Sequence, residues 1–234
     1  TTSLAVVITM ALGIGVATSA YSLIDGLMLR GVSFEDADRL VALRRSNLSG
    51  PRRSISVPEH DFADWRDQQQ SFEALVGFRS GTVNLRDTEP RAQVLLERYS
   101  GAWVSPSFLD VLRVEPMLGR GFEPADAAFG ADPVVLIGYD VWQQDFGGAA
   151  DVVGRTVRVN ARPATVVGVL PEDFGFPVNQ DVWLPLVLQA RGLPRGEGQN
   201  LEVIGRLRDD VPLARAAREM STIAQRLGEA SPET

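Results

Sequence analysis

The residues best suited to chemistry in this sequence gather around its single histidine. His60, Asp61 and Asp64 could form a general-base or metal site, because imidazole and carboxylate groups serve in both roles. On a helix, His60 and Asp64 are four residues apart and share a face, whereas Asp61 faces elsewhere. One histidine beside acids near the start of a helix is more often a solvated surface pair, and we favour that interpretation.

A Gly-Arg-Gly tripeptide at Gly119, Arg120 and Gly121 offers a second candidate site. Successive backbone N–H groups in such a segment can form a nest that binds phosphate. The same tripeptide also suits a turn between a short helix and Phe122, in which glycine supplies a positive φ. We favour the turn.

The residue types exclude several other kinds of chemistry. The chain has 234 residues, no cysteine and no lysine, which removes thiol nucleophiles, cysteine-based zinc sites, Schiff bases and a phosphate-loop lysine. No Gly-x-Ser-x-Gly sequence is present. Five acids are too scattered for a calcium loop: Asp126, Asp132, Asp140, Asp145 and Asp151. We therefore predict no catalytic residue, no metal, no cofactor and no enzymatic activity.

The formal net charge of −7 argues against nucleic acid as a partner, because neutralising phosphates requires a basic surface. All 23 basic residues are arginines. With 44% hydrophobic residues, the chain can bury the core of one medium-sized domain or of two small ones.

The first 24 residues carry no charge and predict a transmembrane helix over Leu4–Ile24, within a segment 1–28. Ala11, Gly15 and Ser19 recur every four positions and would let a second membrane helix approach closely. A cleaved signal peptide is the main alternative, although no basic n-region is present. A Gly-x-Gly dinucleotide loop at Gly13–Gly15 would need a third glycine, and position 18 is Thr.

The rest of the chain mixes strands and helices without regular alternation, which predicts an α+β fold. We expect strands over 40–45 and 201–207 to share one sheet. A helix beginning near Pro58 and an amphipathic helix over 212–227 should cover the same face of that sheet. Other strands are expected over 76–79 and 82–86 as a hairpin, over 133–138, and over 155–159 and 164–169 as a second hairpin.

Several short stretches, in order and spacing, resemble the MacB-like periplasmic core domain of MacB/FtsX-type permeases of ABC transporters. The resemblance is closest to the duplicated permeases of Acidobacteria and their relatives. It rests on these stretches: Ala11–Gly15, Asp38–Val41, Val57–Arg66, Ser71–Glu73, Val104–Phe108, Leu118–Phe122, Val135–Gly138, Trp142, Phe146–Gly148, Asp151–Thr156, Val166–Val169 and Asp181–Leu186.

The resemblance implies an architecture with two lobes outside the cytoplasm. A discontinuous porter-like lobe would comprise 29–102 and 199–234, and an inserted mixed α+β lobe would comprise 103–198. Further transmembrane helices would follow, so that the chain would be a fragment of a longer permease.

The resemblance also implies a function and partners. A non-catalytic permease subunit in the bacterial inner membrane, with its soluble domain in the periplasm, would work with a cytoplasmic ATP-binding cassette ATPase, a second permease copy and a periplasmic adaptor. The alternative is an FtsX-like anchored domain that senses or recruits a partner. The substrate and the direction of transport do not follow from the sequence.

Overall fold

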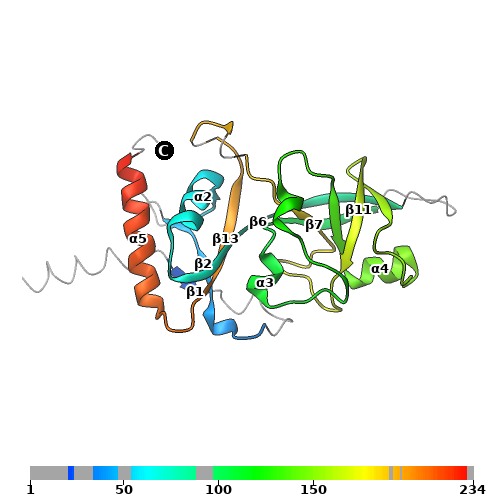
Figure 1. The fold of residues 1–234 in the computed structure, drawn as a ribbon, viewed down its shortest axis with the longest axis horizontal. Helices are drawn as coiled ribbons and strands as arrows, with labels where there is room; N and C mark the ends of the chain where they lie inside the picture. The colour runs from blue at the N-terminus through cyan, green and yellow to red at the C-terminus, as the bar shows by residue number, and fades with distance from the viewer. Residues whose placement is uncertain are drawn as a thin grey trace, which may run out of the picture.

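The computed structural model describes residues 21–23, 34–46, 54–87, 97–189, 192–195 and 197–230. Figure 1 shows the helices α2 and α5 with the strands β2 and β13 at one end, and β7, β11 and α4 at the other. The elements are β1 Tyr21–Leu23, β2 Leu40–Leu43, β3 Arg45–Ser46, β4 Ser54–Ile55, β5 Val57–Pro58, α2 Glu59–Gln68, β6 Phe72–Asp87, β7 Glu97–Val104, α3 Phe108–Leu112, β8 Leu118–Gly119, β9 Val134–Ile137, α4 Tyr139–Phe146, β10 Thr156–Val159, β11 Arg162–Val169, β12 Val182–Pro185, β13 Asn200–Leu207 and α5 Leu213–Ala230, with 3₁₀ turns η1 Ala37–Arg39 and η2 Pro124–Ala127.

One large mixed sheet organises the described residues. Its strands lie in the order β1-β2-β13-β6-β10-β11-β9-β12-β7, with β7 also paired to β6, and with β5 and β8 attached to β13 and β11. Most pairs are antiparallel, whereas β11–β9 and β12–β7 are parallel. The predicted α+β class is therefore confirmed, and the hairpin predicted over 155–169 is present as β10 and β11.

The hairpin predicted at Ser80–Gly81 was wrong, because β6 continues through these residues as one 16-residue strand. Gly81 lies opposite Gly101 of β7. A Cβ added at Gly81 would lie 2.9 Å from the ring of Trp103. Glycine is needed here so that the indole can pack over the strand, and it does not mark a turn.

The two ends of the domain meet in the sheet, as predicted. β13 lies between β2 and β6, with Val203 opposite both Leu43 and Gly77. The helices α2 and α5 cover one face of these strands, where Phe62 and Met220 belong to the same buried cluster as Val203. Residues 40–43 of the predicted strand 40–45 thus share a sheet with β13 that both predicted helices cover, whereas Arg45 belongs to β3, which pairs with β4 in a separate sheet.

The opposite face of β13 carries a buried charge. Arg206 is fully buried, and its Nε donates to the Val111 carbonyl at 2.7 Å, while Nη1 donates to the Asp36 carbonyl at 3.0 Å. Burial lowers the pKa of Arg206, and the nearby charges of Arg113 and Arg39 lower it further. The guanidinium thereby joins β13 to α3 and to the segment before β2.

Most of the predicted transmembrane helix, including Ala11, Gly15 and Ser19, lies outside the described residues. At Tyr21–Leu23 the helix prediction was wrong, because these residues form β1, which pairs antiparallel with Val41–Leu43. The pairing gives β2 a second hydrogen-bonded neighbour in place of an open edge. Among the described residues, no helix is both long and apolar enough to cross a membrane.

Met220 provides a test of how much α5 depends on the sheet for its stability. Its side chain is buried in the cluster between α5, α2 and the sheet. We expect Met220→Ala to lower the free energy of unfolding by about 2–5 kcal/mol, the usual range for emptying a core site. Urea unfolding followed by tryptophan fluorescence would measure the loss.

The matched control is Ser221→Ala, one residue further along the exposed side of α5. It should change the free energy of unfolding by less than about 0.5 kcal/mol. Equal effects of the two substitutions would mean that α5 is not docked as described.

Candidate functional site

The histidine cluster predicted to be a solvated surface pair instead holds a loop in place. His60 Nε2 lies 3.0 Å from the carbonyl oxygen of Leu193, and Asp61 and Asp64 both accept hydrogen bonds from Arg195. Arg195 Nη1 and Asp61 Oδ1 are 2.9 Å apart. The hydrogen bond that Arg195 donates to Asp64 raises the pKa of Arg195. Both acids therefore act as structural anchors for the segment between β12 and β13.

Glu59, in the same turn, is more deeply buried than any of these acids. Its backbone N–H donates to the Gln199 carbonyl at 2.9 Å, and its Oε2 lies 3.4 Å from Gln189 N and from Gln199 Nε2. Gly198 adopts φ +108°, and a Cβ there would lie 2.5 Å from Glu59 Oε1. Glu59 therefore holds Gln189 and Gln199, at the two ends of the loop between β12 and β13, against the start of α2.

These side chains do not converge on one ion. Within the described residues, no group of three or more histidine or acidic side chains could hold a metal. Asp61 also contacts Arg45 at 3.3 Å, so its charge is shared between two arginines. The cluster joins α2 to four residues between β12 and β13, namely Gln189, Leu193, Arg195 and Gln199, and we call this set of contacts the clasp.

The Gly119–Gly121 segment takes the predicted glycine conformation, with φ +75° at Gly119. Gly119 belongs to β8, and a Cβ there would lie only 2.1 Å from the Val167 carbonyl oxygen. Arg120 Nη1 donates to Asp126 Oδ2 at 2.7 Å. The arginine therefore binds η2 and is not positioned around a phosphate.

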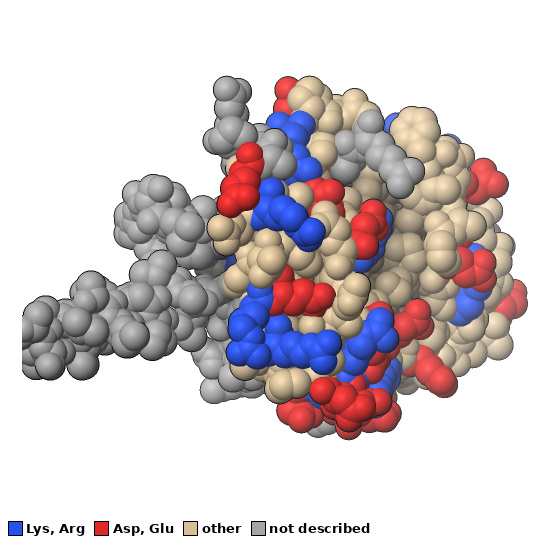
Figure 2. All heavy atoms as spheres, turned by 60° about the vertical axis from the view of Figure 1, so that its left-hand side comes forward, with Lys and Arg blue, Asp and Glu red and all other residues tan. Residues whose placement is uncertain are grey.

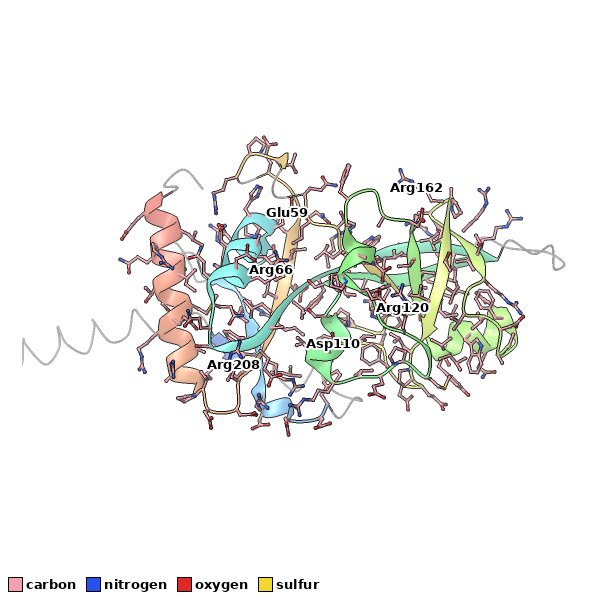
Figure 3. The ribbon with its side chains drawn as sticks, in the orientation of Figure 1. Glu59, Arg66, Asp110, Arg120, Arg162 and Arg208 are labelled. Atoms are coloured by element: carbon pink, nitrogen blue, oxygen red, sulfur yellow. The ribbon has the colours of Figure 1, made fainter. Side chains whose placement is uncertain are left out.

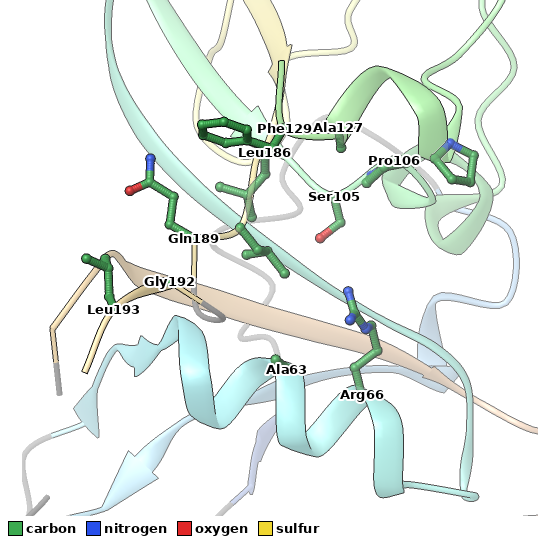
Figure 4. A pocket seen from close by; sticks show the side chains of 12 residues that line it. Ala63, Arg66, Ser105, Pro106, Ala127, Phe129, Leu186, Gln189, Gly192 and Leu193 are labelled. Carbon is green, nitrogen blue, oxygen red and sulfur yellow. The ribbon is translucent and has the colours of Figure 1, made fainter. Parts of the chain in front are cut away.

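The clearest hollow beside these elements is a groove of about 810 Å³ (Figure 4). Ala63 and Arg66 of α2 form one side, and Ser105 and Pro106 stand across from them. The remaining lining comes from η2 with the residues after it and from the segment that follows β12: Pro124, Ala127, Phe129, Leu186, Leu188, Gln189, Gly192 and Leu193. The clasp thus fixes one wall of the groove, because Leu193 belongs to both.

The sequence prediction missed this groove and two of the arginines around it. Arg66 was seen only as part of the helix, and Arg195 was not singled out. Figure 3 places Glu59 and Arg66 on α2, with Arg120 in the other half of the molecule. The amphipathic pattern of α2 could have identified Ala63 and Arg66 as a face separate from Phe62 and Trp65.

Residues 3–223 match the MacB-like periplasmic core domain family. The chain belongs to this family, and it is the extracytoplasmic core domain of a MacB-like ABC transporter permease. A relative is the probable syringafactin export ATP-binding/permease protein SyfD of Pseudomonas syringae pv. syringae (strain B728a), which is 34% identical over 85 residues. That match spans 35% of this chain and 13% of the relative's length.

Solved structures show the same fold at low sequence identity. The periplasmic region of MacB from Actinobacillus actinomycetemcomitans matches with a TM-score of 0.58 and 17% identity, covering 88% of this chain and 89% of that one. The extracellular domain of the noncanonic ABC-type transporter YknZ from Gram-positive bacteria matches with a TM-score of 0.55 and 16% identity, covering 83% of this chain and 94% of that one. A domain of a putative permease protein from Porphyromonas gingivalis matches with a TM-score of 0.56 and 19% identity, covering 86% of this chain and 89% of that one.

The Arg120–Asp126 pair predicts a particular dependence of stability on pH. The hydrogen bond from Arg120 lowers the pKa of Asp126 below its ordinary value. A depressed carboxyl pKa stabilises the fold above the pKa of the unfolded chain, about 3.9, and this contribution is lost as the pH falls through the folded-state value. Arg120→Gln should therefore lower the free energy of unfolding at pH 6 and change it little at pH 2.

Because water screens the partly exposed Arg120, we expect the cost at pH 6 to be no more than about 1 kcal/mol. Urea unfolding of both chains at pH 6, 4 and 2 would measure it. Arg162→Gln, which changes an exposed arginine on β11, is the matched control. If the difference in free energy of unfolding between wild type and Arg120→Gln stays constant down to pH 2, the Arg120–Asp126 pair does not stabilise the fold as described.

Proposed function

We propose that this domain transmits the motion of an ATP-driven permease to a substrate outside the cytoplasm. The observation that carries the proposal is the family match over residues 3–223, which is nearly the whole chain. The name of the Pseudomonas relative, an export ATP-binding/permease protein, favours export over import. ATP would be hydrolysed by a separate cytoplasmic ATP-binding cassette subunit.

The mechanical route that we propose runs along β6. One lobe would comprise 29–102 and 199–234, and the inserted lobe 103–198. β6 pairs with β13 from Phe72 to Phe78 and with β7 from Phe78 to Leu85. A hydrogen-bonded strand is stiff along its length, so a displacement at the end that carries α5 would reach the end that carries α4 (Figure 1).

We further propose that the uncharged segment before β1, from Leu4 onward, anchors the chain in the inner membrane, with the described domain in the periplasm. Ala11, Gly15 and Ser19 would face a neighbouring membrane helix. A second permease copy and a periplasmic adaptor are the remaining proposed partners. Figure 2 shows basic and acidic side chains interspersed over the end that carries α5, a surface suited to polar protein contacts.

The membrane topology can be tested directly. A periplasm-specific reporter fused after Thr234 should be active, and the fusion protein should stay in the membrane fraction after washing with carbonate. Replacing three apolar residues of the anchor by aspartate should release it, because charged residues at the bilayer centre are costly. A soluble mature product that begins near Ala20 would contradict the anchor and indicate a signal peptide.

Coupling can be tested by bridging the groove. These 234 residues contain no cysteine, so that Ala63→Cys with Pro106→Cys gives one pair on opposite sides of the groove once any cysteine elsewhere in the permease has been replaced by serine. In the full permease with its ATPase, a cleavable bis-maleimide across this pair should change ATP hydrolysis at least about threefold, roughly 0.6 kcal/mol of barrier. Cleaving the bridge should restore the rate.

Each single-cysteine variant, treated in the same way, is the control for modification alone. If the domain only recruits a partner, as in the FtsX-like alternative, the bridge should leave ATP hydrolysis unchanged. That outcome would reject mechanical coupling while leaving the topology intact.

A further inference from the structure

The groove beside α2 has the size and surface of a ligand pocket. Its volume of about 810 Å³ lies within the ~300–1,000 Å³ typical of sites for small molecules. Leu188, Leu193 and Phe129 give it an apolar lining. Phe129 is 92% exposed, although a large aromatic ring gains free energy when another molecule covers it.

A basic side chain enters the groove, although the chain as a whole is acidic. The net charge of the chain is −7, yet Arg66 is the one charged side chain among the described residues that line the groove. Its Nε donates to Asp67 Oδ1 at 3.2 Å, and its guanidinium carbon lies 5.8 Å from the centre of the Phe62 ring. Figure 4 shows the end of the side chain reaching up from α2 into the space below Ser105 and Leu186.

We propose that this groove binds an amphiphile with one acyl chain and an anionic head group, such as a fatty carboxylate. Arg66 would pair with the head group, since its guanidinium presents donors that match the two oxygens of a carboxylate. The chain would lie along Leu188 and Leu193 and would cover Phe129. Binding of this ligand is independent of the proposed transport, because it requires only the fold of this domain.

The test uses the 234-residue chain in nanodiscs of phosphatidylcholine, a lipid with no net charge. The probe is dodecanoate that carries a photoreactive diazirine at the end of its acyl chain. Mass spectrometry should locate the cross-links on peptides that contain Leu188, Leu193 or Phe129. Competing dodecanoate should halve the yield at a concentration about fivefold lower than dodecylamine, a difference of roughly 1 kcal/mol.

Substitutions of Arg66 test the head-group contact, and substitutions that fill the groove test the contact with the acyl chain. Arg66→Gln should remove the preference for dodecanoate over dodecylamine, while Arg66→Lys should keep most of it and Arg162→Gln should keep all of it. Ala63→Trp should fill the groove and suppress the part of the cross-linking that competing dodecanoate displaces in the wild-type chain. If Ala63→Trp does not fold, Gly192→Trp replaces it, since a Cβ at Gly192 meets nothing within 4 Å.

Three results would overturn the proposal. One is equal competition by dodecanoate and dodecylamine in the wild-type chain. Another is a set of cross-links confined to peptides outside the groove, which would indicate insertion of the probe into the lipid. The third is an unchanged cross-linking yield in a folded groove-filling variant. None of these results bears on membrane topology or coupling to the ATPase, so the proposed function would be judged separately.

Discussion

The buried guanidinium of Arg206 is the constraint on which the packing of the described residues depends. A charge without water must find acceptors, and Arg206 takes the carbonyls of Val111 and Asp36. Val111 lies in the last turn of α3, where backbone carbonyls lack helical partners and the helix end favours a cation. One residue of a central strand therefore fixes both a helix and the segment that leads into β2. An apolar residue there would take this donor from the Val111 carbonyl, at a cost of about 1–3 kcal/mol, whereas the Asp36 carbonyl would keep its hydrogen bond from Arg39 N at 3.1 Å.

The position of α3 then determines one wall of the groove. Ser105 and Pro106 come just before the helix, and Ser105 Oγ both accepts from Gly77 N at 2.9 Å and donates to Gly77 O at 3.1 Å. Phe108 packs against Phe78 of β6 with ring centres 5.9 Å apart. The continuous strand β6 is thus held to α3 by a hydroxyl and an aromatic pair, and the groove opens beside this junction. The wall at Ser105 and Pro106 is held to β6 by these contacts, and the wall at Leu193 is held to α2 by the clasp.

The sequence predicted those elements in which apolar residues recur at the spacing of a helix or a strand. The stripe on α5, the β10–β11 hairpin and the shared sheet of β2 and β13 follow from side-chain spacing. The ion pairs could not be predicted from spacing, because Arg195 and Asp64 are 131 residues apart in the sequence and the position of a charged residue does not reveal a partner so distant. Gly81 was misread for a related reason: the ring that requires a glycine there belongs to Trp103 on another strand. The groove was missed because it exists only where these long-range contacts bring separate segments together.

The helix α2 shows how one short sequence serves three surfaces at once. Residues three apart lie on the same side of a helix, and each step of one residue turns the chain by about 100°. Phe62 and Trp65 therefore face the sheet, where both are buried. The pair 61 and 64 faces the loop that carries Arg195, and the pair 63 and 66 faces the groove. Since the first two surfaces fix the helix in place, the third can hold a charged arginine at the groove without being needed for folding.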